Sequence, residues 1–98
     1  MALVEFANAA IADLDEIDDY SIEQFGEDAA QSYMHGFKEA FAQLQDYPRS
    51  GQPATELGKN MRCLTHRRHR IFYRIEAEQV LILRILHDAM DAKRQFAN

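Results

Sequence analysis

The strongest constraint on the fold is a pair of amphipathic segments that follow one another along the chain with almost no connection between them. In the first, which starts at Asn8, apolar residues share one arc of a helical wheel and acidic residues occupy the opposite arc. The apolar arc holds Ala10, Ile11, Leu14, Ile17 and Phe25. We expect Asn8 to cap this helix and Gly26 to end it in a left-handed conformation that other residues resist.

The second segment starts at Glu27 or Asp28 and carries a cleaner apolar stripe at helical spacing. This stripe consists of Ala30, Tyr33, Met34, Phe37, Ala40, Phe41 and Leu44. Two amphipathic helices with so short a connection fold back on each other as an antiparallel hairpin. Such a hairpin can cover only one face of a sheet.

Strand patterns flank the two helical segments. Leu3–Phe6 alternates like an opening strand, and Pro48 prevents the second helix from continuing into the turn at Pro48–Pro53. Later strands are expected at Met61–Thr65, Arg70–Glu76 and Val80–Leu86, followed by a tail or short helix from Asp88 to Phe96. The 98 residues therefore predict a single domain, 1–98, of the α+β class, in the order strand–helix–helix–strand–strand–strand. The helical hairpin is expected to pack on one face of an antiparallel-rich four-stranded sheet.

The last expected strand is apolar on both sides apart from Arg84, which is typical of a central strand. Strict alternation divides such a strand between two faces, and the hairpin leaves one of them open. The residues expected on the open face are Val80, Ile82, Arg84 and Leu86. The neighbouring strand adds either Ile71, Tyr73 and Ile75 or the favoured set, Arg70, Phe72 and Arg74. A face that mixes apolar side chains with arginines predicts a binding partner.

Charge divides the chain into two unlike halves. Residues 1–60 hold three Lys/Arg against twelve Asp/Glu, a net charge of −9, whereas residues 61–98 hold eight against four, a net charge of +4. Five arginines lie between Arg62 and Arg74. Either these arginines complement the acidic helices and keep strand edges soluble, or they form a surface for RNA, DNA or an acidic protein segment.

Common catalytic and metal-binding patterns are missing from the sequence. The four glycines are too scattered for a phosphate-binding loop, and no serine has the surroundings of a catalytic triad. His66 and His69 lie three apart on an expected strand or turn, a spacing that points them to opposite faces, so we interpret them as solvated. Cys63 is the single cysteine, which excludes an internal disulfide and fits a reducing compartment. We expect no metal and no cofactor.

The apolar runs of the chain are short. The longest, such as Val80–Leu83, have four residues, whereas a membrane-spanning helix needs about twenty. The N-terminus has no basic flank and no apolar stretch of signal-peptide length. We therefore expect a soluble, cytoplasmic protein.

Five short motifs, in this order along nearly the whole chain, resemble the ParE branch of the RelE/ParE superfamily of bacterial toxins. They are Ala10-x-x-Asp13-Leu14-x-x-Ile17-x-x-Tyr20, Leu44-x-x-x-Pro48-x-x-Gly51, Met61-Arg62-x-Leu64, Tyr73-Arg74-Ile75 and Ile82-x-Arg84-Ile85-Leu86-His87. The resemblance implies the toxin of a type II toxin–antitoxin system, a bacterial cytoplasmic protein that a ParD-like antitoxin neutralises. The antitoxin's acidic, apolar tail is expected to lie over the helical hairpin and to pair with a sheet edge.

The two branches of the superfamily imply different mechanisms. ParE-like members inhibit DNA gyrase and are not enzymes, and this interpretation is favoured here by the long helices and the Ile85-Leu86-His87 ending. The residues then expected to bind the target or the antitoxin are Arg62, Arg70, Phe72, Arg74, Val80, Ile82, Arg84 and Leu86. The alternative is a RelE-like, ribosome-dependent mRNA endoribonuclease. Its catalytic groups would be Arg70, His87 and Glu56, acting in acid–base catalysis and charge stabilisation.

Overall fold

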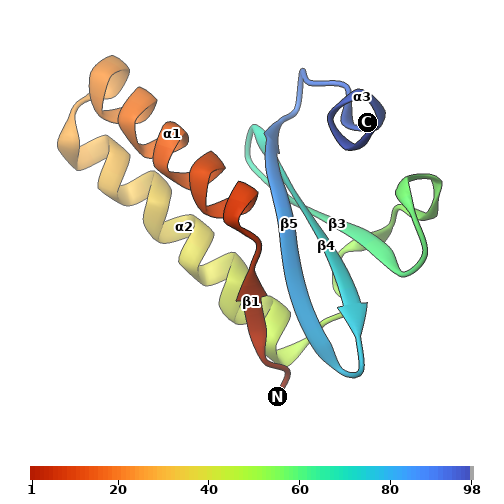
Figure 1. Ribbon diagram of the computed structural model, residues 1–98. Helices are drawn as coiled ribbons and strands as arrows, with labels where there is room; N and C mark the ends of the chain where they lie inside the picture. The colour runs from red at the N-terminus through yellow and green to blue at the C-terminus, as the bar shows by residue number, and fades with distance from the viewer. Residues whose placement is uncertain (98) are drawn as a thin grey trace.

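A computed structural model describes residues 1–97 and shows two long helices packed beside a twisted sheet (Figure 1). The helices are α1 (Asn8–Phe25), α2 (Glu27–Asp46) and the short α3 (Ala92–Phe96), with a 3₁₀ turn, η1, at Thr55–Leu57. The strands are β1 (Val4–Phe6), β2 (Gln52–Pro53), β3 (Met61–His66), β4 (His69–Glu76) and β5 (Gln79–His87). The α+β class and the predicted order of elements are confirmed. None of the helices in this range is both long enough and apolar enough to span a membrane.

The sheet has five strands in the order β1-β5-β4-β3-β2, one more strand than predicted. β1 pairs in parallel with β5, and the other neighbours are antiparallel. The additional strand, β2, arises because Gln52 and Pro53 leave the proline turn in extended form and pair with Cys63 and Arg62. β2 lies at the sheet edge, where the missing amide of a proline costs no ladder hydrogen bond.

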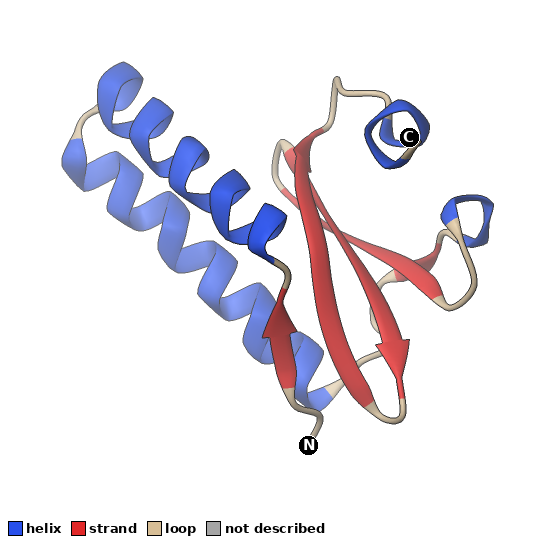
Figure 2. Cartoon of the chain, in the orientation of Figure 1, coloured by secondary structure: helices blue, strands red, loops and turns tan. Residues whose placement is uncertain are grey.

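The helical hairpin forms as predicted, with one difference at its start. Ala7 takes the extended N-cap conformation, so Asn8 already belongs to the first turn of α1 and the prediction that Asn8 caps the helix is wrong. Gly26 does end α1, at φ 89°, and α2 begins at the next residue. The hairpin covers one side of the sheet, as Figure 2 shows.

The main core lies between this hairpin and the sheet. It is built from small and aromatic residues of the helices and branched residues of the strands, among them Ala10, Phe37, Leu44, Ile71, Tyr73, Val80, Ile82 and Ile85. α1 buries a narrower arc than its sequence predicts. Ala10, Leu14 and Ile17 pack in the core, whereas Ile11 and Phe25 are exposed, by 47% and 71% of their surfaces.

A register shift in β5 overturns part of the prediction for its two faces. Phe72 pairs with Arg84, but the next residue, Tyr73, pairs with Ile82, so Leu83 is an extra residue in β5. Such a bulge interrupts alternation, and residues on both sides of it can face the same layer. Val80 and Ile82, expected on the open face, are fully buried beneath the helices together with Ile85.

The opposite face holds a second, smaller core that the chain itself covers in part. Leu86 and Phe72 lie there with Met61, so the prediction that the arginine-bearing set of β4 faces away from the helices is confirmed. However, α3 turns back over this face and places Phe96 against Phe72, with ring centroids 5.6 Å apart. The expectation that this face of apolar side chains and arginines is left open is therefore wrong in part, because Phe96 and Leu57 cover its apolar residues from within the chain.

Candidate functional site

Arg84, expected on the open face, instead joins β5 to α1. Its Nε and Nη2 donate to the two carboxylate oxygens of Asp13 at 2.8 and 3.0 Å, and the amide of Ile85 donates to the same carboxylate at 2.8 Å. Both side chains are mostly buried, since 25% of the Arg84 side chain and 11% of the Asp13 side chain are exposed. The hydrogen bonds that Arg84 donates to Asp13 raise the pKa of Arg84 above its usual value. Two residues of the family-like motifs thus form an internal ion pair.

Arg62 holds the proline turn that leads into β2. Its guanidinium donates to the carbonyl oxygens of Gly51, at 2.7 and 3.1 Å, and of Arg49, at 3.0 Å. The Tyr73 hydroxyl completes the turn, because it donates to the Pro48 carbonyl and accepts from the Gly51 amide. A Cβ on Gly51 would lie 2.7 Å from that hydroxyl, so only glycine fits. The Pro48-x-x-Gly51 motif therefore encodes a packed turn.

The face opposite the hairpin is basic. Arg70 donates to the Met90 carbonyl at 2.7 Å and lies over the Phe72 ring, with the guanidinium carbon 5.2 Å from the ring centroid. Arg74 forms a half-exposed ion pair with Glu76 at 2.9 Å. α3, which covers part of this face, adds the exposed Lys93 and Arg94.

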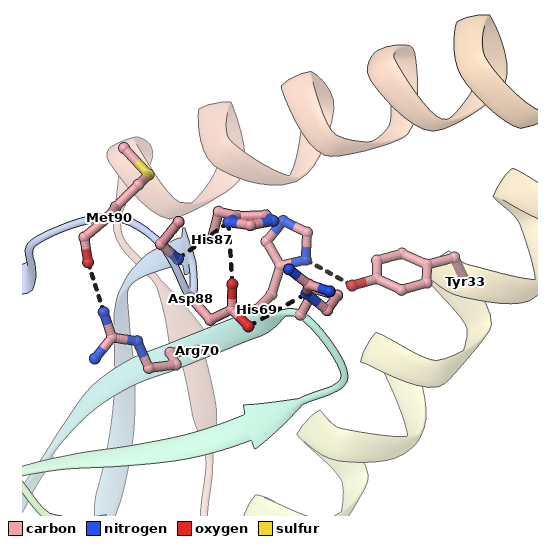
Figure 3. Close-up of polar contacts among 8 residues, drawn as sticks. Tyr33, His69, Arg70, His87, Asp88 and Met90 are labelled. Carbon is pink, nitrogen blue, oxygen red and sulfur yellow. Dashed lines mark hydrogen bonds and ion pairs between the residues drawn. The ribbon is translucent and has the colours of Figure 1, made fainter.

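The three groups of the endoribonuclease alternative do not converge. Glu56 and Arg70 line one groove of about 450 Å³ on the basic face. His87 pairs with His69 across β4 and β5, and the His69 side chain lies against α2 on the other face. Figure 3 shows Arg70 directed toward Met90 and away from both imidazoles. Acid–base catalysis requires its groups within hydrogen-bond reach of one substrate, and this arrangement does not provide that.

A cluster of three histidines and a tyrosine, which the sequence did not predict, lies where the sheet meets α2. His66, His69 and His87 occupy paired positions on three adjacent strands. The Tyr33 hydroxyl lies 2.6 Å from His69 Nδ1, and the His69 and His87 rings are 5.4 Å apart, edge to face (Figure 3). The prediction that His66 and His69 point to opposite faces is wrong, because Arg67, at φ 53°, helps to reverse the chain between them. His66 and His69 flank a two-residue turn, and this pattern is the sequence signal that could have predicted that they lie side by side.

Burial controls the titration of this cluster. It lowers the pKa of His69, and the charges of His87 and His66 lower it further. Burial also lowers the pKa of His66, whose ring packs against the Phe37 ring with the two centroids 4.6 Å apart. Within residues 1–97, no three His, Cys, Asp or Glu side chains are placed to hold a metal ion.

A groove of about 410 Å³ runs beside this cluster, between α1 and the end of β5. Ile17 and Tyr20 line it from α1, and His87 and Met90 line it from the sheet side. Tyr20 is 58% exposed, although it is large and aromatic. Two carboxylates of α1 also line the groove, Glu16 and Asp13, and Asp13 is paired with Arg84.

Comparison with known proteins gives one consistent result. Residues 4–92 match the family model described as "ParE toxin of type II toxin-antitoxin system, parDE". The chain is 33% identical over 87 residues to "Toxin ParE1" of Mycobacterium tuberculosis (strain H37Rv), covering 88% of this chain and 89% of that protein. It is 33% identical over 84 residues to "Toxin ParE1" of Caulobacter vibrioides, covering 86% of each. A solved chain from the "Chromosomal ParDE TA system from P. aeruginosa" superposes with a TM-score of 0.76 at 25% identity, covering 89% of this chain and 96% of that one.

Proposed function

This chain belongs to the ParE toxin family of type II toxin–antitoxin systems, and on that premise we propose that it inhibits DNA gyrase and so stops DNA replication. The observation that carries the proposal is the family match over residues 4–92, which includes both long helices and every strand. Inhibition of this kind needs no proton-transfer groups. It needs a surface that binds the cleaved gyrase–DNA intermediate better than the resealed state, because that preference alone stalls resealing.

The proposed activity is non-enzymatic. Arg70 and His87, two of the three groups that the endoribonuclease alternative requires, lie on opposite faces of the sheet. The ring of His69 lies closer to His87, at a centroid distance of 5.4 Å, whereas Glu56 and Arg70 line a different groove. We therefore assign the target to a protein complex in the bacterial cytoplasm and not to mRNA.

A cognate ParD-like antitoxin is the proposed neutralising partner, and the structural relative from a ParDE system supports this assignment. The distribution of charge refines the expectation of an acidic tail over the hairpin. Residues 8–46 carry ten Asp/Glu and one lysine, so an acidic tail would meet charges of its own sign there. We assign the hairpin and the α1–β5 groove to an antitoxin segment with apolar and basic residues. The acidic part of the antitoxin fits the basic face around Arg70 and Arg74.

The decisive experiment compares the two possible targets in parallel. Purified toxin is added to gyrase with plasmid DNA, and separately to ribosomes translating an mRNA. We expect cleaved DNA to accumulate, mRNA to stay intact, and added antitoxin to reverse the effect. Intact DNA together with cut mRNA would establish the endoribonuclease alternative.

Two substitutions give matched controls for this comparison. An endoribonuclease that used His87 and Arg70 would lose about 10²-fold or more of its rate in His87→Gln and Arg70→Ala. A gyrase inhibitor would keep most of its potency in His87→Gln. Loss of DNA cleavage by that variant, with its fold intact, would place His87 on the gyrase-binding surface.

A further inference from the structure

The histidine cluster connects α2 to three strands through one hydrogen bond and a set of ring contacts. We propose that His66, His69 and His87 with Tyr33 form an acid-sensitive contact between α2 and the sheet, in which protonation of His69 places a positive charge among other basic groups under α2 and loosens α2 from the sheet. The proposal concerns the stability and dynamics of the fold, so it stands independently of gyrase and the antitoxin.

The 2.6 Å hydrogen bond between the Tyr33 hydroxyl and His69 Nδ1 joins α2 to β4. A phenol hydroxyl can donate or accept, so this bond can form with a neutral or a protonated imidazole. Burial raises the pKa of Tyr33, so at neutral pH the phenol stays uncharged and supplies no negative charge to His69. Protonation of His69 would therefore place a positive charge with little compensation in the half-buried contact between β4 and α2.

The surroundings of His69 provide little compensation for a positive charge. The turn between β3 and β4 contributes Arg67, whose guanidinium lies 6.0 Å from the Tyr33 ring centroid, and Arg68. β3 and β5 contribute His66 and His87. Asp88 is the near carboxylate, and it already lies 3.3 Å from Arg68 and 3.2 Å from His87. The remaining acidic groups on this side are Glu39 of α2 and Asp13 and Glu16 of α1, and Asp13 is held by Arg84.

Helix α2 lies directly on the imidazoles, so their rearrangement must affect its packing. At Gly36, an added Cβ would collide with the His66 ring, which shows how closely the helix backbone approaches β3. The Tyr33 and Phe37 rings contact His69 at centroid distances of 5.6 and 5.8 Å. A shift of His69 or His66 therefore acts on the middle of α2.

The sign of the pH dependence follows from the pKa of His69, which burial and the neighbouring histidines lower in the folded state. An unfolded histidine titrates near pH 6.5 and binds the proton more readily. The contribution of neutral His69 to the free energy of unfolding is therefore complete above about pH 6.5. It decreases as the pH falls below that value, until the ring is also protonated in the folded state. Each pKa unit between the two states changes the folding equilibrium constant by about tenfold.

The test is urea unfolding of the intact protein between about pH 7.5 and pH 5, in the range where histidines titrate. The variant His69→Asn keeps an acceptor near the position of Nδ1 but cannot be protonated. We expect the wild type to lose stability toward pH 5 and His69→Asn to lose about half as much or less. His35→Asn, an exposed histidine on the same helix, is the matched control and should follow the wild type.

A second measurement keeps the proposal testable if His69→Asn folds poorly. NMR titration of the wild-type imidazoles should give His69 a pKa below that of an unfolded histidine, and amide exchange around Tyr33 should accelerate as His69 is protonated. Titration of His69 at or above its unfolded value would overturn the proposal. Equal pH dependence of stability in the wild type and in His69→Asn would also overturn it.

Discussion

The helical hairpin and the basic face of the sheet carry opposite charge, and they differ more in how that charge is used. Three arginines on the sheet, Arg62, Arg70 and Arg74, make hydrogen bonds or ion pairs within the chain, and Arg84 pairs with Asp13 of α1. On the hairpin, Asp13 is the only carboxylate with an ion-pair partner among residues 1–97. The sequence draws attention to the arginine cluster, but those cations largely hold the fold. The acidic hairpin is the surface whose charge is left for a partner.

The largest effect is expected at Asp13, the hairpin carboxylate that is an exception to this contrast because it stabilises the fold. Asp13→Ala would leave the Arg84 guanidinium and the Ile85 amide without their shared acceptor. We expect the free energy of unfolding to fall by about 3 kcal/mol, as for other mostly buried pairs that lose one member. Chemical denaturation measures the effect, and Asp15→Ala, an exposed carboxylate on the same helix, should change it by less than about 0.5 kcal/mol.

The turn held by Arg62 tests the structural role of the sheet side. Gly51→Ala would push a Cβ to 2.7 Å from the Tyr73 hydroxyl and from the Cys63 carbonyl oxygen. We expect a loss of about 1–3 kcal/mol in the free energy of unfolding, because neither neighbour is at the free end of a flexible chain. Thermal melting measures the effect. As a control, Ser50→Ala, at the exposed neighbouring position, should have a melting temperature close to that of the wild type. An unchanged melting temperature in Gly51→Ala would contradict the packed turn.

Charge reversal on the hairpin tests whether its exposed carboxylates contribute to antitoxin binding. In Glu16→Lys with Asp19→Lys, two exposed carboxylates of α1 become cations without loss of an internal ion pair. We expect about tenfold weaker binding of the antitoxin, more at low salt than at high salt, with an unchanged fold. Calorimetry at two salt concentrations measures it, with Glu78→Lys in the β4–β5 turn as control. If the antitoxin binds this double variant as tightly as the wild type, the hairpin is not its charged docking surface.

The smallest effect is expected at Arg74, the arginine whose internal partner is most exposed. Arg74→Gln removes a half-exposed ion pair with Glu76, which should change stability by about 0.5 kcal/mol or less. Its effect on antitoxin binding should exceed its effect on folding, whereas Arg62→Gln should show the reverse order. Parallel denaturation and binding measurements on the two variants separate the arginines that serve the fold from those available to a partner.

Local chemistry determined much of this fold from the sequence alone. The helical periods, Gly26 between them and Pro48 after them specify a helical hairpin without reference to any distant residue. Each of these signals acts within a few residues, through backbone conformation or side-chain spacing. The family-like motifs were visible for the same reason, although their roles as an ion pair and a packed turn were not.

Contacts between distant residues decided what the sequence could not. The bulge at Leu83 arises from pairing between β4 and β5, and it moved Val80 and Ile82 beneath the helices against the expected alternation. The pairing of Arg84 with Asp13 spans 71 residues, and that of Tyr33 with His69 spans 36. A side chain's partners depend on strand register and on how the layers pack, and neither leaves a periodic trace in the sequence. Periodicity therefore predicted the elements, while the tertiary structure decided which charges the fold uses and which it leaves exposed.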